Sequence, residues 1–170
     1  SGATLDINGV AIGSEALTID GTGVGGIGAL TGTGTASLSG GVTLNGTTPT
    51  VGGAGTLTLS GIVADGTTNT LTKVGAGTLI LSGANAYTGS SSVNAGILNI
   101  QHNTALGTSA AGTTVANGAT LEIQNTITVT GEGLTATGDG VGGTAGVIHN
   151  VGGANIWTGT VAISSTINVD

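Results

Sequence analysis

Short runs of alternating apolar and polar residues recur along the chain, in a phrase of the type Gly-Thr-Leu-x-Leu. The two apolar residues of the phrase stand two positions apart, so they lie on one face of an extended strand. Gly, Ala, Asn and Ser separate the runs, and these residues favour turns. The strand phrase occurs at Ala3–Ile7, Gly55–Leu59, Gly77–Leu81, Gly96–Ile100 and Ala119–Ile123. The pattern predicts short strands joined by tight turns.

The first apolar residue of the phrase recurs at a nearly constant period. It stands at Leu57, Leu79, Leu98 and Leu121, with gaps of 22, 19 and 23 residues. Periods of about 20 residues are typical of stacked solenoid coils. One phrase cannot bury its Leu and Ile alone, whereas copies stacked as parallel strands about 4.8 Å apart can. The sequence therefore predicts an all-β parallel β-helix (β-solenoid) of about 20 residues per coil, with the leucines in one column.

The densest stretch of this pattern is Gly75–Gln101. Its predicted strands are Thr78–Leu81, Ser91–Asn94 and Ile97–Ile100. Between them lies the motif Gly83–Gly89 (GANAYTG), which returns as Gly153–Gly159 (GANIWTG). Tyr87 and Trp157, the only Tyr and the only Trp in the chain, therefore occupy the same position of one repeated motif.

A longer repeat returns the beginning of the chain 116 to 119 residues later. The matched pairs are Gly2–Ile7 with Gly118–Ile123, Glu15–Thr18 with Glu132–Thr135, Val24–Gly26 with Val141–Gly143, and Val42–Leu44 with Val161–Ile163. When the ends are joined, Thr166–Asp170 followed by Ser1–Gly9 aligns without gaps on Thr48–Gly61. We therefore expect residues 1–170 to form a single, open-ended solenoid domain. We further expect this domain to be one period of a longer tandem chain or of an end-to-end array of copies.

Three glycine-rich pieces interrupt the strands at Gly21–Gly28, Gly52–Gly55 and Gly138–Gly146. They are short and regularly placed, so we interpret them as turns between coils and not as flexible linkers. The chain starts at Ser1 without Met, and we expect it to be processed or cut from a longer protein.

The composition supports strands and excludes several classes of partner. Charged residues make up 5% of the chain, too few to cover solvent-facing helices, and 36 residues are Gly. A net charge of −7 with a single Lys and no Arg argues against nucleic acid and against anionic lipid. No apolar run approaches the roughly 20 residues of a membrane helix, so we expect no direct membrane insertion. The absence of Cys decides little.

The stretches Gly75–Gln101 and Ala145–Asp170 resemble the passenger-associated strand repeats of bacterial autotransporters. A coil in that family has the pattern G-x-G-T-L-x-L-x-G-x-N-x-Y-x-G, followed by a strand and A-G-x-L-x-V. The match is close from Leu71 to Ile100. The resemblance implies a right-handed parallel β-helix that is exported and displayed on the outer membrane of a Gram-negative bacterium, or released from it. It also implies that the repeat has no catalytic residues.

No motif in the sequence predicts a cofactor or a metal. Gly21–Gly26 fits G-x-G-x-x-G, but no helical pattern follows it to hold a pyrophosphate. Asp20–Gly23 and Gly138–Gly140 have the Gly-Asp character of calcium solenoids without the required nine-residue repetition. The acidic pairs at equivalent repeat positions are Asp6 with Glu122 and Glu15 with Glu132. We interpret these four as solvated outer-face residues that keep the rod soluble, and we expect no metal site.

Catalysis is not predicted either. Lys73 is the only cation available to stabilise developing charge, and His102 and His149 occupy non-equivalent positions. A Ser-His-Asp set is recognised by geometry, so the sequence leaves it open. We therefore interpret the chain as a non-enzyme.

Tyr87 and Trp157 are the candidate glycan contacts, because an exposed aromatic ring can stack on a sugar. The alternative is that this aromatic packs at a coil corner with its polar tip in water. Thr residues at the first position of the strand phrase could also form a face that binds glycan or ice. These are Thr4, Thr56, Thr78 and Thr120.

Three functions follow from the pattern. The first is a structural spacer rod within an extracellular or surface-displayed adhesin-like protein. The second is a protomer of an extracellular filament or surface layer, built by head-to-tail stacking, since uncapped parallel edges are templates for further strands. The third is a glycan-binding adhesin face that contacts a host surface.

Overall fold

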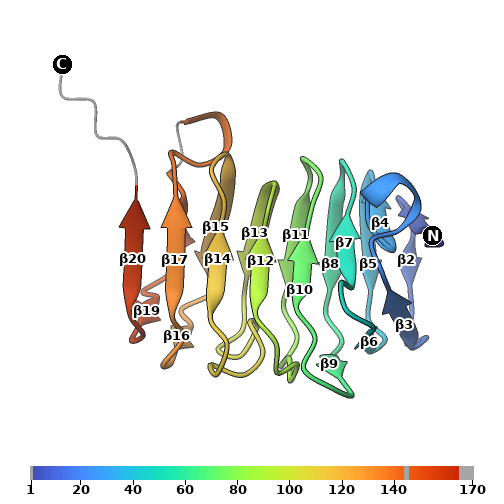
Figure 1. Cartoon of the computed structure of the whole chain (residues 1–170), viewed down its shortest axis with the longest axis horizontal. Helices are drawn as coiled ribbons and strands as arrows, with labels where there is room; N and C mark the ends of the chain where they lie inside the picture. The colour runs from blue at the N-terminus through green and yellow to red at the C-terminus, as the bar shows by residue number, and fades with distance from the viewer. Residues whose placement is uncertain (1, 144–145, 165–170) are drawn as a thin grey trace.

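The computed structural model describes residues 2–143 and 146–164. Over these residues the chain winds as a β-solenoid with about 22 residues per turn, and the strands of successive coils pair in parallel. Figure 1 shows the coils stacked side by side along the long axis, with the first coil at one end and the last at the other. The predicted fold class is confirmed. The right-handed sense of coiling stays a prediction.

Each coil contributes strands to up to three faces. Within the described residues the first face is an eight-stranded sheet of β1 (Leu5–Asn8), β4 (Leu30–Thr33), β7 (Thr50–Gly52), β10 (Leu71–Lys73), β12 (Ser91–Val93), β14 (Thr113–Val115), β17 (Leu134–Thr137) and β20 (Val161–Ser164). The second face is a seven-stranded sheet of β2 (Ala11–Ile12), β5 (Thr35–Leu38), β8 (Thr56–Leu59), β11 (Thr78–Leu81), β13 (Gly96–Ile100), β15 (Ala119–Gln124) and β18 (Ile148–Gly152).

The third face carries shorter pieces. Near the start of the chain they are β3 (Leu17–Asp20), β6 (Val42–Asn45) and β9 (Val63–Asp65), and near its end β16 (Thr128–Val129) and β19 (Ile156–Trp157). Two short 3₁₀ turns, η1 (Val24–Gly26) and η2 (Val141–Gly143), project from the coils. The described residues include no helix with the length and apolar character needed to cross a bilayer.

The predicted leucine column exists. In the seven-stranded sheet Leu57 is the register partner of Leu79, Leu79 of Leu98, and Leu98 of Leu121. All four side chains are buried inside the solenoid. A second buried column runs beside the first through Leu59, Leu81, Ile100 and Ile123. Apolar burial is therefore continuous from coil to coil, which is how a rod this thin obtains a core.

Glycines stack at the coil corners because the backbones approach too closely there for a side chain. A Cβ on Gly77 would collide with the Gly55 carbonyl oxygen, and a Cβ on Gly96 would lie 2.5 Å from the Gly77 carbonyl oxygen. Real Cβ atoms do not make such contacts. The abundance of Gly therefore follows from coil stacking as well as from the tight turns.

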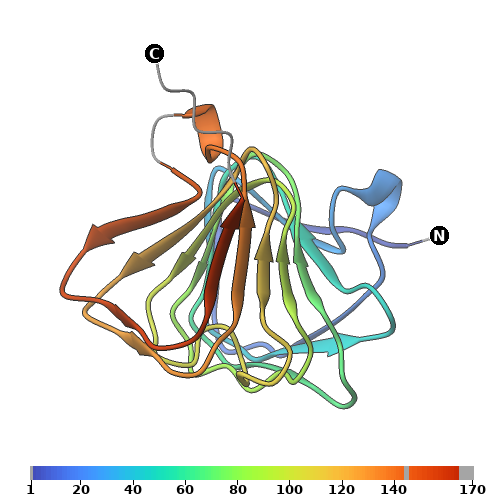
Figure 2. The same cartoon turned by 60° about the vertical axis from the view of Figure 1, so that its left-hand side comes forward.

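The long repeat is preserved in local structure but shifted around the axis. Over its first three residue pairs the pairing of β1 with β4 has the register of β15 with β18, which then shifts between Ile123 and Gln124. The pairing of β3 with β6 has the register of β17 with β20. The first pair lies in the eight-stranded sheet, however, and its copy lies in the seven-stranded sheet. The second copy is therefore displaced by one face. In Figure 2 the η1 and η2 excursions accordingly leave the stack at different corners.

A threonine hydroxyl at the same repeat position anchors the 3₁₀ turn in each copy, η1 in the first and η2 in the second. Thr4 Oγ1 accepts a hydrogen bond from the Val24 N–H at 2.9 Å and donates to the Gly28 carbonyl at 2.8 Å. The second copy repeats both bonds, at 2.9 and 3.1 Å, with Thr120, Val141 and Gly146. Gly21–Gly28 is thus a turn between coils, as predicted. These two hydroxyls hold loops and are not free to form a Thr-rich binding face.

The alignment that joins the two ends involves Thr166–Asp170, which lies outside the described residues.

Candidate functional site

The centre of the repeated GANAYTG motif is an asparagine that connects three coils. Asn85 Oδ1 accepts from the Val63 N–H at 2.8 Å, and Asn85 Nδ2 donates to the Ala105 carbonyl at 2.7 Å. In the second motif Asn155 Oδ1 accepts from the Ile127 N–H at 2.8 Å. The amide therefore satisfies backbone groups that the corner leaves unpaired, and the motif repeats for a structural reason.

Tyr87 lies in the core with an exposed fraction of 0%. Its hydroxyl lies 2.6 Å from Ser91 Oγ, and burial raises the pKa of the phenol. The expectation that the polar tip of this aromatic is in water is wrong for Tyr87, because the coil corner closes over it. A sugar cannot reach the ring in this fold.

Trp157 occupies the equivalent position in the last described coil and is only partly buried. Its Nε1 donates to the Glu132 backbone carbonyl at 2.8 Å. The ring is therefore held against the preceding corner, and its glycan contact stays a proposal.

Glu132 is the main departure from the sequence interpretation. It was expected on the solvated outer face, but its exposed fraction is 3%. Thr113 Oγ1, from the preceding coil, donates to Glu132 Oε1 at 2.7 Å. Burial raises the pKa of the Glu132 carboxyl, and the Thr113 hydrogen bond offsets part of that rise. Glu15, its counterpart in the first copy, is exposed, because no described strand lies over it.

The other acidic pair behaves closer to expectation. Asp6 is exposed and accepts hydrogen bonds from Thr31 Oγ1 at 3.1 Å and Thr33 Oγ1 at 2.9 Å. Glu122 accepts from Asn99 Nδ2 at 2.9 Å and lies 3.6 Å from His149 Nδ1. Over the described ranges no three Asp, Glu, His or Cys side chains gather as a metal cluster.

Lys73 is buried, although it is the only cation in the chain. Its Nζ donates to the carbonyls of Val74 at 2.9 Å, Gly75 at 2.8 Å and Ala95 at 3.0 Å. Burial lowers the pKa of the Lys73 ammonium to about 8. The three carbonyls use all of its donors. Lys73 therefore joins two coil corners and has no donor left for a substrate.

The histidines do not assemble a nucleophilic set in the part of the chain that the structure describes. His102 Nδ1 lies 3.2 Å from Thr104 Oγ1, and His149 faces Glu122. Neither imidazole is hydrogen bonded to a serine among these residues.

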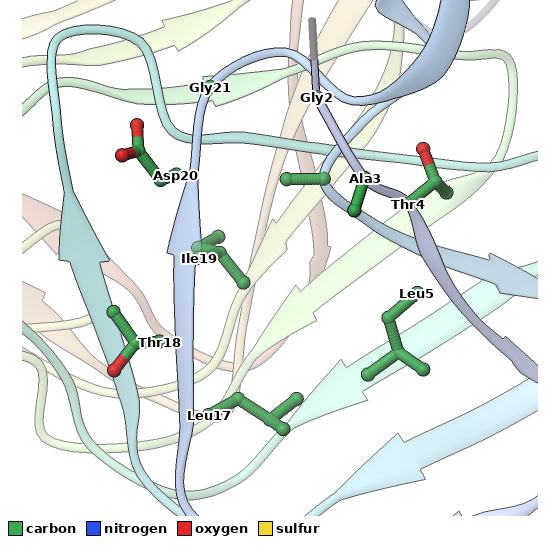
Figure 3. Close-up of a pocket in the computed structure, with 10 residues that line it drawn as sticks. Gly2, Ala3, Thr4, Leu5, Leu17, Thr18, Ile19, Asp20 and Gly21 are labelled. Carbon is green, nitrogen blue, oxygen red and sulfur yellow. The ribbon is translucent and has the colours of Figure 1, made fainter.

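The open end of the first coil forms a hollow of about 550 Å³, drawn in Figure 3. Leu5 and Leu17 line it, and Leu5 is 43% exposed. Their counterparts in the second copy, Leu121 and Leu134, are covered by β13 and β14 and are buried. The hollow is therefore the uncovered inner edge of the stack and not an enclosed ligand pocket.

Stacked parallel coils, glycine corners and the asparagines of the two repeated motifs define the described residues as a β-solenoid. Residues 71–100 match the passenger-associated-transport-repeat family, which confirms the resemblance over the stretch that carried it.

The chain is also similar to the adhesin BmaC autotransporter of Brucella suis biovar 1 (strain 1330). The two are 37% identical over 107 residues, which cover 59% of this chain and 3% of the adhesin. This chain thus corresponds to a small part of that relative's length. No solved structure matches it significantly.

Proposed function

We propose that the chain is a non-catalytic structural segment of an adhesin-like autotransporter passenger, exported and displayed at the bacterial surface. The observation that supports this proposal is the continuous leucine column, which runs through every coil from Leu57 to Leu121. The polar groups at the corners also support a structural role, since the side chains of Asn85 and Lys73 form hydrogen bonds between coils. The segment supplies length and resistance to proteolysis, while adhesion resides elsewhere in the passenger.

A segment swap in a displayed passenger tests this proposal. The chain is replaced by an unrelated β-solenoid of equal length, and cell adhesion and surface exposure of a distal epitope tag are measured. If the chain is a spacer, cell adhesion and tag exposure should both survive the swap, and shortening the segment should reduce both. If adhesion disappears after the equal-length swap while the tag stays exposed, the segment itself binds a partner, such as a glycan, and the spacer proposal fails.

Head-to-tail assembly is the second candidate, and the uncovered ends favour it. Leu5 at the first coil and Val161 and Ile163 at the last are 43%, 48% and 56% exposed. Two different ends that fit each other make a heterologous contact, which extends into a fibre when it does not close.

Blocked ends test the assembly. Leu5→Asp is placed on one variant and Ile163→Asp on another, with Thr114→Asp on the side of the rod as the control. Assembly predicts that the control forms filaments, that each end variant alone stays monomeric, and that an equimolar mixture gives only dimers by analytical ultracentrifugation. A monomeric control, or filaments from either end variant, contradicts it.

A further inference from the structure

A second hollow, of about 470 Å³, lies where three successive coil corners meet beside Glu132. Its wall combines oxygen-bearing side chains with a small apolar part. The oxygen-bearing residues include Asn103, Ser109 and Thr130, and the apolar ones Leu106 and Val129. A wall of this kind offers hydroxyl oxygens to a ligand that enters it, while the Asn103 amide oxygen already accepts the Thr128 N–H at 2.8 Å.

Glu132 is the charged residue of this wall. One of its oxygens accepts the Thr113 hydroxyl, and the other has no hydrogen-bond partner among the described residues. The next coil holds the backbone of Glu132, because Trp157 donates to its carbonyl and a Cβ on Gly159 would collide with that carbonyl. Glu132 is therefore held through its backbone at the edge of the hollow.

Among the described residues no Lys or Arg side chain pairs with this carboxylate. The chain has a single Lys or Arg, and the Nζ of that residue, Lys73, is bound by three backbone carbonyls. A buried carboxylate without a positive partner is costly, which agrees with the raised pKa of Glu132. A cation in the hollow would remove that cost.

We propose that this hollow binds a divalent cation of the Ca²⁺ type, with the free oxygen of Glu132 as its charged ligand. Oxygens of the wall and water complete the coordination, since Ca²⁺ takes carboxylate, carbonyl and water oxygens in flexible geometry. With one carboxylate the site is weak, on the order of 10⁻⁴–10⁻³ M, as in extracellular calcium modules. The bound ion would join three coil corners and stiffen the rod where the metal is present.

Glu15 provides a matched control, because it is the repeat counterpart of Glu132, is exposed, and removes the same charge when replaced by Gln. Thermal unfolding of the wild type, Glu132→Gln and Glu15→Gln is measured with and without millimolar CaCl₂. We expect Ca²⁺ to raise the Tm of the wild type and of Glu15→Gln, and to leave Glu132→Gln unchanged. An equal response in all three variants, or no response in the wild type, overturns the proposal.

Terbium luminescence gives a second readout that does not depend on stability. Trp157 contacts Glu132 through its Nε1, so Tb³⁺ in the hollow should show emission sensitised by this indole. We expect Ca²⁺ to displace that emission, and Glu132→Gln but not Glu15→Gln to abolish it. Ethylammonium chloride is the remaining probe. Stabilisation by ethylammonium without any by Ca²⁺ would show an ammonium site and contradict the proposed metal.

Discussion

Replacing Gly77 by Ala tests how closely the coils approach. Gly77 has no left-handed φ, so Ala can adopt its backbone conformation, and the whole effect is steric. The added Cβ would collide with the Gly55 carbonyl oxygen and the Ala54 carbonyl carbon. Both atoms are backbone, and the pairing of β8 with β11 immediately after the corner prevents them from moving away.

The expected decrease in the free energy of unfolding is the difference between two opposing effects. Overpacking against atoms that cannot relax costs about 3 kcal/mol, the upper part of the usual range. Ala also lowers the conformational entropy of the unfolded chain, which stabilises the folded state by about 0.4–1 kcal/mol. The free energy of unfolding should therefore fall by about 2 kcal/mol, which lowers the Tm by roughly 4–8 °C for a chain of this size.

Urea unfolding followed by far-UV circular dichroism measures this loss, and Gly66→Ala is the control. Gly66 also lacks a left-handed φ, but its Cβ would meet nothing within 4 Å. Ala at this position should be neutral or stabilising by up to about 1 kcal/mol. If Gly77→Ala is as stable as Gly66→Ala, the corners do not pack as described and the steric reasoning is refuted.

Two further substitutions test the buried Lys73 ammonium and the Asp65 carboxylate. Lys73→Met should lower the free energy of unfolding by about 2–4 kcal/mol, because three carbonyls lose their donor. The wild type should gain stability between pH 8 and 10.5, where the unfolded chain binds the proton that folded Lys73 releases, and Lys73→Met should lack this gain. Burial alone would raise the pKa of Asp65, but hydrogen bonds donated by Thr88 and Asn69 lower it overall. Asp65 stabilisation is therefore complete above pH 3.8 and lost as the pH falls through the lowered pKa, so acid titration of Asp65→Asn should lack that loss. Urea midpoints measured across pH test the Lys73 and the Asp65 predictions. If the pH profile of a variant runs parallel to that of the wild type, the prediction for that residue is contradicted.

The stacking of the coils could be predicted from the sequence, because the alternation within the strands and the period near 20 residues both place the same leucines inside the solenoid. Thr78–Leu81 is β11 with the predicted bounds, and Leu79 has the predicted neighbours. The face on which each strand lies could not be predicted. Leu5 and Leu121 begin equivalent phrases, yet they belong to different sheets, since every face of a solenoid requires the same inward and outward alternation.

The surroundings of the corner side chains were harder to predict, because they depend on the coil that lies above. Glu15 and Glu132 are equivalent in the repeat, but only Glu132 is covered, by Thr113 of the preceding coil. The sequence did contain a signal for Lys73 that was missed. It stands two positions after Leu71, on the inward side of its strand, where the register partner in the next coil is Val93.

In-register stacking of the coils is the central claim, and a distance between two spin labels tests it most directly. The chain has no Cys, so Ser37→Cys and His149→Cys introduce unique labelling sites. Register partners connect these positions through Thr58, Ile80, Asn99 and Glu122. Five steps of about 4.8 Å predict a narrow distribution of label-to-label distances centred at about 24 Å, although the two residues are 112 positions apart in the sequence. A broad distribution, or a distance more than twice that value, would contradict the stacked solenoid.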